Sequence, residues 1–188
     1  MPKLKTFLFF ILFFIFLGFY GYNAISQPNK EQIISIIHQI EDMPYYPELS
    51  GDSLFWALAM EGLAIVPNLI DLLDDTTETN ISVPNFGRFY TIGDISFCIL
   101  TDIIHDLPIM DIFKSKKDYH IEGDLVYFEF VRYSKENRNY LKTKLHDWFV
   151  ENKENLIWVK DKRKFRKVSS DWKYPTNQLP TKGYYKLK

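Results

Sequence analysis

Residues 51–58 read GDSLFWAL and residues 93–100 read GDISFCIL, and these two stretches decide the expected fold. Glycine, aspartate, phenylalanine and leucine recur in the same order, and Gly93 follows Gly51 by 42 residues. A period of roughly 40 to 47 residues is typical of stacked pairs of antiparallel helices, because no single pair can bury its apolar face alone. Residues 50–113 therefore predict two copies of a helix, a turn and a second helix.

Local signals for helix starts and breaks agree with this assignment. Ser50, ahead of Gly51 and Asp52, and Thr91, three residues before Asp94, place capping oxygens and a negative charge where the first backbone N–H groups of a helix lack acceptors. Asn29, followed by a glutamine three residues later, predicts a capping box at the start of a leading helix. Gly62 interrupts the first run, and Pro67 suits the first turn of the next helix, where its missing N–H costs nothing.

One part of the first copy resembles a known family. Residues 64–75 read AIVPNLIDLLDD, which combines a small residue, a proline, a Leu-Ile pair, a Leu-Leu pair and acids. This stretch resembles the second helix of a HEAT-type (armadillo-like) repeat. The resemblance implies an all-α fold in which antiparallel helix pairs stack as a short α-solenoid. Because HEAT-type proteins are mostly scaffolds, it also implies binding to other proteins.

The N-terminus carries an export signal. Lys3 and Lys5 precede an apolar run over residues 7–17, and small residues precede a cleavage position after Ser26. This pattern predicts a signal peptide over residues 1–26 and a periplasmic or secreted protein. The alternative is a membrane anchor formed by a single uncleaved helix, because the apolar stretch approaches the roughly 17 residues that a thin bilayer crossing requires.

The rest of the chain is expected to form a helical domain, residues 27–155, followed by a basic C-terminal extension, residues 156–188. Residues 124–133 are apolar on all sides and therefore ambiguous between a helix and a strand, and a helix is favoured. Residues 136–152 predict an amphipathic helix. Within the extension, residues 156–160 and 165–168 suit a small β-hairpin, and an irregular tail is expected after it.

The connection between the two copies is a candidate binding loop. Residues 76–90 are long for a helix connection and rich in aromatic and turn-forming residues. The candidate binding residues are Phe86, Arg88, Phe89 and Tyr90. Their rings suit stacking on a sugar or a peptide beside the arginine, but the same rings also suit packing on the helices. Both interpretations are open.

The charges of the chain are unevenly distributed. The formal net charge is −1, but residues 27–131 carry 5 basic and 18 acidic residues, whereas residues 132–188 carry 16 basic and 6 acidic ones. The candidate basic patch comprises Lys160, Lys162, Arg163, Lys164, Arg166 and Lys167, with Trp158 and Phe165 interleaved. It suits an anionic partner, and the alternatives are a solvated face or a charge match with the acidic segment. In an exported protein the relevant anions are lipid head groups, cell-wall polymers and acidic proteins, and the compartment argues against nucleic acid.

The sequence assigns no catalytic, cofactor-binding or metal-binding residue. It contains no serine elbow, phosphate-cradling glycine loop or paired Cys and His motif, and its one cysteine cannot form an internal disulfide. Asp102, His105 and Asp106 have helical spacing, which permits a metal or an acid–base pair but is a weak signal.

These observations predict an exported binding or scaffold protein of the cell envelope. Its expected partner is another protein or an anionic envelope component, with membrane contact through the N-terminal apolar segment as a further option. The alternative function is that of a hydrolase acting on an envelope polymer through Asp52, Asp94 and Asp102. Capping of helix starts already accounts for Asp52 and Asp94, which favours the binding protein over the enzyme.

Overall fold

The computed structural model describes most of the chain after residue 26. The described residues are 27–44, 48–49, 51–84, 86–114, 125–161, 166–167 and 180–188. The predicted signal peptide or anchor lies outside them. Within these ranges, none of the helices is both long and apolar enough to span a membrane.

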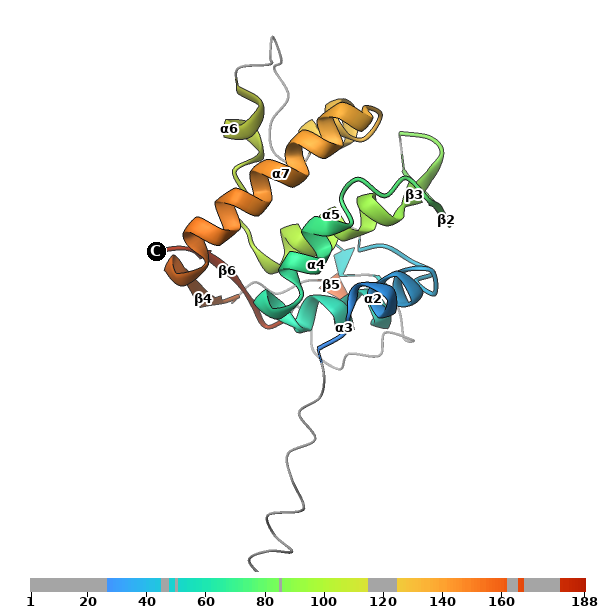
Figure 1. Cartoon of the computed structure of the whole chain (residues 1–188). Coiled ribbons are helices and arrows are strands. Elements are labelled where there is room, and N and C mark those ends of the chain that lie inside the picture. Colours follow the sequence, from blue (N-terminus) through green and yellow to red (C-terminus); the bar gives the residue numbers. More distant parts are fainter. Residues whose placement is uncertain are drawn as a thin grey trace, which may run out of the picture.

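Helix α5 (Ile92–Ile103) is the central element of the structure. Nine of its 12 residues are buried, and the helices α3 (Ser53–Met60) and α4 (Val66–Asp71) pack against it (Figure 1). Helix α2 (Lys30–Ile37) contacts all three of these helices, and α7 (Lys135–Asn152) packs on α4. Their apolar side chains form a common core, so the segments before and after α5 are joined through it.

The predicted helix starts are confirmed. The side chain of Asn29 caps α2 in a capping box with Gln32, and the carboxylate of Asp52 accepts a hydrogen bond of 2.7 Å from the N–H of Leu54 at the start of α3. Thr91 caps α5 in a second capping box, and Pro67 lies in the first turn of α4. Each cap joins residues two or three positions apart, which explains why the local sequence predicts it.

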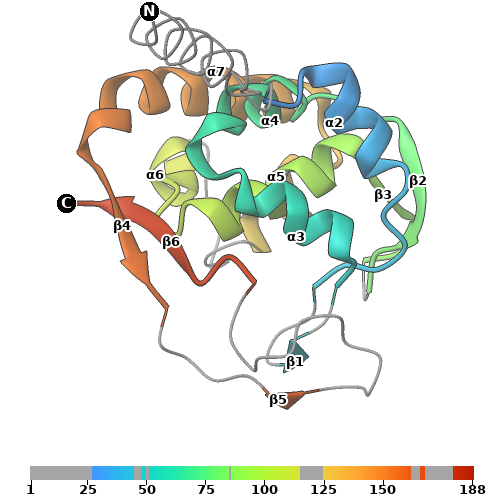
Figure 2. The same cartoon turned by 90° about the horizontal axis from the view of Figure 1, so that it is seen from below.

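The connection between the two expected copies folds as a β-hairpin. Strand β2 (Glu78–Ser82) pairs in antiparallel register with β3 (Phe89–Thr91), with Glu78 opposite Thr91 and Ser82 opposite Phe89. This hairpin lies at one end of the structure, and the strands β4 and β6 lie at the other (Figures 1 and 2).

The C-terminal strands pair differently from the expected hairpin. Strand β4 (Leu156–Lys160) forms as predicted, but it pairs in antiparallel register with β6 (Gly183–Leu187), which belongs to the tail that was expected to be irregular. Strand β5 (Arg166–Lys167) pairs instead with β1 (Glu48–Leu49), in parallel register (Figure 2). The predicted pairing of residues 156–160 with 165–168 is therefore wrong.

The expected all-α solenoid is also wrong, because the fold mixes helices with small β-sheets. The two Gly-Asp pairs that suggested a repeat occupy different helix positions. Asp52 precedes α3 as its N-cap, whereas Asp94 is the third residue of α5 and Thr91 is the N-cap. The second expected helix pair is completed only by the short helix α6 (Ile109–Phe113).

The ambiguous apolar segment is helical, as favoured. Residues Tyr127–Val131 form a π-helical turn, η3, and the N–H of Arg132 donates to the carbonyl of Tyr127 over 2.8 Å. The amphipathic helix predicted at residues 136–152 is confirmed as α7.

Candidate functional site

The predicted binding loop does not present its rings together. Tyr90 is buried, and this burial raises the pKa of its hydroxyl. Phe86 is partly buried and its ring centroid lies 5.5 Å from that of Phe128. Phe89 and Arg88 are exposed, and Arg88 has a left-handed backbone (φ of 60°). Binding through this loop stays a prediction that depends on Arg88 and Phe89.

The predicted basic patch is described only in part. Lys160 is exposed at the end of β4. The backbones of Arg166 and Lys167 pair with β1, and residues 162–164 lie outside the described residues. Recognition of an anion by this patch therefore also stays a prediction.

Asp94 forms the centre of a buried charge cluster. Its carboxylate is fully buried, and it accepts hydrogen bonds from Arg138 Nη2 at 2.6 Å and Arg132 Nε at 2.9 Å. The Tyr127 hydroxyl and the N–H of Thr91 also donate to it, at 3.0 and 2.9 Å. Burial, together with the Asp94 carboxylate, raises the pKa of the Tyr127 hydroxyl well above its ordinary value of 10.0, which keeps this hydroxyl protonated as a donor.

The two arginines extend this cluster to the backbone of distant segments. Arg138 donates to the carbonyls of Leu73 and Arg132, at 3.0 and 2.7 Å, and to the hydroxyls of Tyr127 and Thr91. Arg132 donates to the carbonyl of Phe89 at 2.6 Å. The four acceptor positions of the Asp94 carboxylate and the five donors of Arg138 are thus all used, which leaves neither group available for a substrate. The cluster stabilises the fold by joining α4, the hairpin, α5 and α7.

A surface cleft lies between α3, α5 and the β4–β6 sheet. Its volume is about 260 Å³, just below the about 300–1,000 Å³ typical of sites for drug-sized ligands. The lining residues are Ala59, Met60, Glu61, Gly62, Asp102, Ile103, Trp158, Thr181, Gly183 and Tyr185. Among these described residues are two acids and no lysine or arginine, so the described lining favours a positively charged or hydrogen-bond-donating group.

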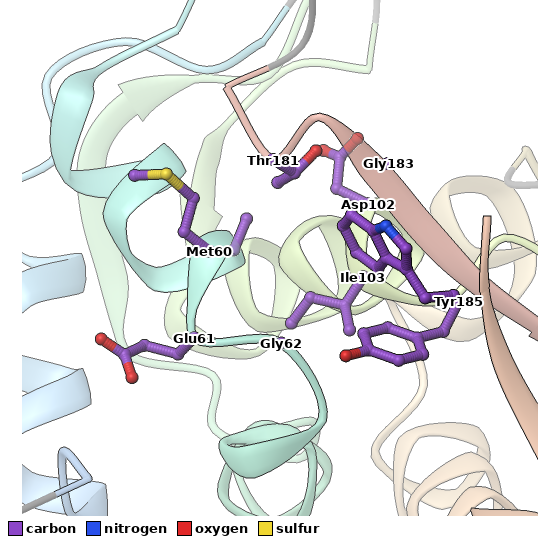
Figure 3. A pocket seen from close by; sticks show the side chains of 10 residues that line it. Met60, Glu61, Gly62, Asp102, Ile103, Thr181, Gly183 and Tyr185 are labelled. Carbon is purple, nitrogen blue, oxygen red and sulfur yellow. The ribbon is translucent and has the colours of Figure 1, made fainter. Parts of the chain in front are cut away.

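Aromatic side chains form one wall of the cleft. The indole of Trp158 is 49% exposed, and it meets the ring of Tyr185 edge-on with centroids 5.1 Å apart. Gly183 allows the indole to lie close to the backbone, because a Cβ there would be 2.5 Å from Trp158 Cζ2. The hydroxyl of Tyr185 points toward Gly62 (Figure 3). This wall holds an indole in place while leaving half of its surface to a ligand.

Polar groups occupy other parts of the cleft. Thr181 Oγ1 is buried and has no hydrogen-bond partner among the described residues. Asp102 lies on α5, and Glu61 lies at the C-terminal end of α3. In Figure 3 the Glu61 carboxylate points away from Tyr185 and Ile103. The acids therefore do not converge on one point, although both contribute negative potential.

The remaining polar residues show no metal site. His105 stacks on the ring of Tyr184 with centroids 4.1 Å apart. Across the described part of the chain, no group of three or more His, Cys, Asp or Glu side chains could hold a metal ion. The sequence pattern of Asp102, His105 and Asp106 thus gains no support as a metal site.

Sequence reasoning missed most of the cleft. It singled out Trp158 within a basic strip and Asp102 as a candidate acid, but it did not place them together. Met60, Thr181 and Tyr185 carried no local signal, because they come from two segments, α3 and residues 180–188, that meet only in the folded chain.

Comparison of this chain with protein-family models, with curated proteins and with solved structures finds no match. The resemblance to HEAT-type repeats therefore stays an expectation from the sequence, and the functional argument depends on the geometry of the cleft.

Proposed function

We propose that this protein is an exported binding module of the cell envelope that holds a basic side chain of a partner protein in its cleft. The observation that supports the proposal is the half-exposed Trp158 in a cleft whose described lining includes two acids and no base. A lysine or arginine over an indole face gains about 0.5–2 kcal/mol, depending on desolvation, and carboxylates strengthen the hydrogen bonds of its head group.

The size of the cleft also supports a side chain over a larger ligand. A volume of about 260 Å³ suits one long side chain, whose stem would pack on Trp158 and Tyr185. Thr181 Oγ1 would give the bound head group an acceptor.

A hydrolase has less support. Cleavage of a glycosidic bond generally needs two carboxyl groups about 5–10 Å apart that flank the same bond. Asp94 is enclosed with its acceptor positions filled, Asp52 caps α3, and the Glu61 carboxylate points away from Tyr185 and Ile103. Asp102 alone does not provide the acid–base pair that this reaction requires.

The binding of a basic side chain is tested by titrating the protein with N-acetyl-arginine amide and recording the indole N–H signals by NMR. We expect the Trp158 signal, assigned with a Trp158→Phe variant, to shift at millimolar ligand. The neutral isostere N-acetyl-citrulline amide should bind at least about fivefold more weakly, since about 1 kcal/mol of charge-dependent attraction is lost.

Matched variants make this test specific to the cleft. Trp158→Ala, followed by the backbone amide signals of the cleft because its indole signal is absent, should weaken binding about fivefold or more, whereas Val150→Ala, at an exposed apolar position on α7, should leave it unchanged. A Trp158 signal that neither compound shifts would exclude the cleft as this binding site. Equal affinity for the two compounds would exclude recognition of the charge.

Export is tested by the intact mass of the protein expressed with its own leader. We expect a mass that begins at Gln27, in the soluble envelope or medium fraction. A full-length mass in the membrane fraction would replace the secreted module with an anchored one. A full-length mass in the cytosol would contradict export altogether.

A further inference from the structure

The outer edge of β4 has backbone groups that β6 does not use. The N–H of Asp161 donates to the carbonyl of Lys182, and the N–H of Lys188 donates to the carbonyl of Asn155, both at 3.1 Å. Because hydrogen-bonded pairs alternate along an antiparallel ladder, the odd-numbered residues of β4 face β6. The backbone groups of Trp158 and Lys160 therefore face away from β6.

The opposite edge of the sheet is already joined to the protein. Tyr185 of β6 accepts a hydrogen bond of 3.0 Å from the N–H of His105, next to a bridge between Ile104 and Tyr185. Within the described ranges, no strand pairs with the outer edge of β4. An added strand would therefore extend this sheet at β4 and not at β6.

The side chains of β4 do not protect this edge. Proteins commonly protect an edge strand with charges, prolines, bulges or a covering segment. In β4, Ile157 and Trp158 are 40% and 49% exposed, and the one charged residue is Lys160 at the end of the strand. An exposed apolar edge of this kind is typical of β-strand addition, in which backbone hydrogen bonds supply affinity and alternate side chains supply specificity.

The charge of the sheet favours one occupant. Lys186 lies opposite Ile157 in the register, Lys182 and Lys188 flank β6, and Lys160 ends β4. Residues 156–160 and 183–188 contain no acid. A second copy of this chain would bring lysines toward lysines, whereas an acidic segment of another protein would gain attraction.

We infer that an extended segment of the partner protein pairs with the outer edge of β4. Its acidic side chains lie on the face of Ile157 and Lys186, and a basic side chain lies on the face of Trp158, where the acid-lined cleft opens. This inference depends on the proposed function, because Trp158 contributes its indole to the cleft and its backbone to the edge. The partner is thus a strand-forming segment with alternating acidic and basic side chains.

The test uses a fluorescein-labelled nine-residue peptide with lysine and valine on one face and glutamate and threonine on the other. Its affinity is measured by fluorescence anisotropy, with a scrambled peptide of the same composition as control. Two further peptides are N-methylated at every second residue, one at the odd and one at the even positions. We expect one methylated peptide to bind at least tenfold more weakly and the other to keep its affinity, because only alternate N–H groups face β4.

Protein variants test the same edge from the other side. Lys160→Pro removes an N–H that faces outward and spares the hydrogen bonds to β6, so it should weaken binding severalfold more than Lys160→Thr, which removes only the charge. Both variants are checked by thermal unfolding, which should be unchanged within a few degrees.

The possible outcomes separate this inference from the proposed function. Equal effects of the two methylation patterns, no binding of the peptide, or concentration-dependent dimerisation through β4 in sedimentation would each overturn strand addition. The proposed function would stand in those cases if N-acetyl-arginine amide still shifts the Trp158 signal. Loss of that signal change as well would overturn both.

Discussion

Asp94→Asn is expected to destabilise the protein by about 3–5 kcal/mol, the cost of breaking a buried ion pair by removing one partner. The substitution nearly preserves the shape of the side chain, but it removes the negative charge that faces Arg132 and Arg138. Both guanidinium groups then stay in the interior without a counter-charge. At about 2–4 °C per kcal/mol for a chain of this size, the unfolding midpoint should fall by roughly 6–20 °C.

The measurement is thermal or urea unfolding followed by circular dichroism. Asp52→Asn is the matched control, because Asp52 also caps a helix but is in no buried ion pair with another described residue, and it should cost well under about 1 kcal/mol, since asparagine caps helices about as well as aspartate. A double variant with Arg138→Gln should cost less than the sum of the single changes, since the two residues are in contact. Similar stabilities of the Asp94→Asn and Asp52→Asn proteins would contradict a central role for the cluster.

Gly93→Ala is expected to be the second most damaging change. In the interior of an exposed helix, alanine is about 1 kcal/mol more favourable than glycine. Here an added Cβ would lie 2.6 Å from the carbonyl oxygen of Leu73 and 2.8 Å from that of Asp75. Neither atom can rotate away, because both belong to the backbone, and the N–H of Gly93 is held by Asp75 at 2.9 Å.

The expected cost of Gly93→Ala is near the upper end of the about 1–3 kcal/mol typical of overpacking. Arg138 Nη1 would also lie 2.7 Å from the new Cβ, so the alanine disturbs the charge cluster. Gly87→Ala is the control, because Gly87 has a φ of 67° but no atom within 4 Å of the added Cβ. Urea unfolding compares the two. A Gly93→Ala protein as stable as the Gly87→Ala protein would show that α5 can move away from α4 at little cost.

The repeated Gly-Asp pair shows how one sequence motif can have two physical causes. Gly51 has a φ of 98° and precedes the cap of α3, whereas Gly93 lies within α5 because the backbone carbonyls of Leu73 and Asp75, which follow α4, approach it closely. Glycine permits both arrangements, so the sequence alone could not separate them. Reading both pairs as the same helix start led to the expected solenoid.

The cleft was predictable only in fragments for a related reason. A tryptophan in a predicted strand was visible in the sequence, and so was an acid on an apolar helix, but the exposure of the tryptophan was not. Trp158 and Asp102 come together because β4 pairs with β6. Strand β5 is nearer to β4 in the sequence, but it pairs with β1. A short separation in the sequence favours a hairpin between residues 156–160 and 165–168. The contacts of Tyr185 with the end of α5 favour instead the pairing of β4 with the more distant strand β6.

Features that arise between residues a few positions apart are predictable from the amino-acid sequence. These features are the caps at Asn29, Asp52 and Thr91, the amphipathic pattern of α7 and the strand at 156–160. The way in which α5 is held follows from tertiary packing, because Arg132 and Arg138 reach Asp94 from 38 and 44 residues away. The capping box with Thr91 accounts for the Asp94 carboxylate from neighbouring residues. The ion pairs of Asp94 with Arg132 and Arg138 form only when packing brings α7 against α4 and excludes water from the charged groups.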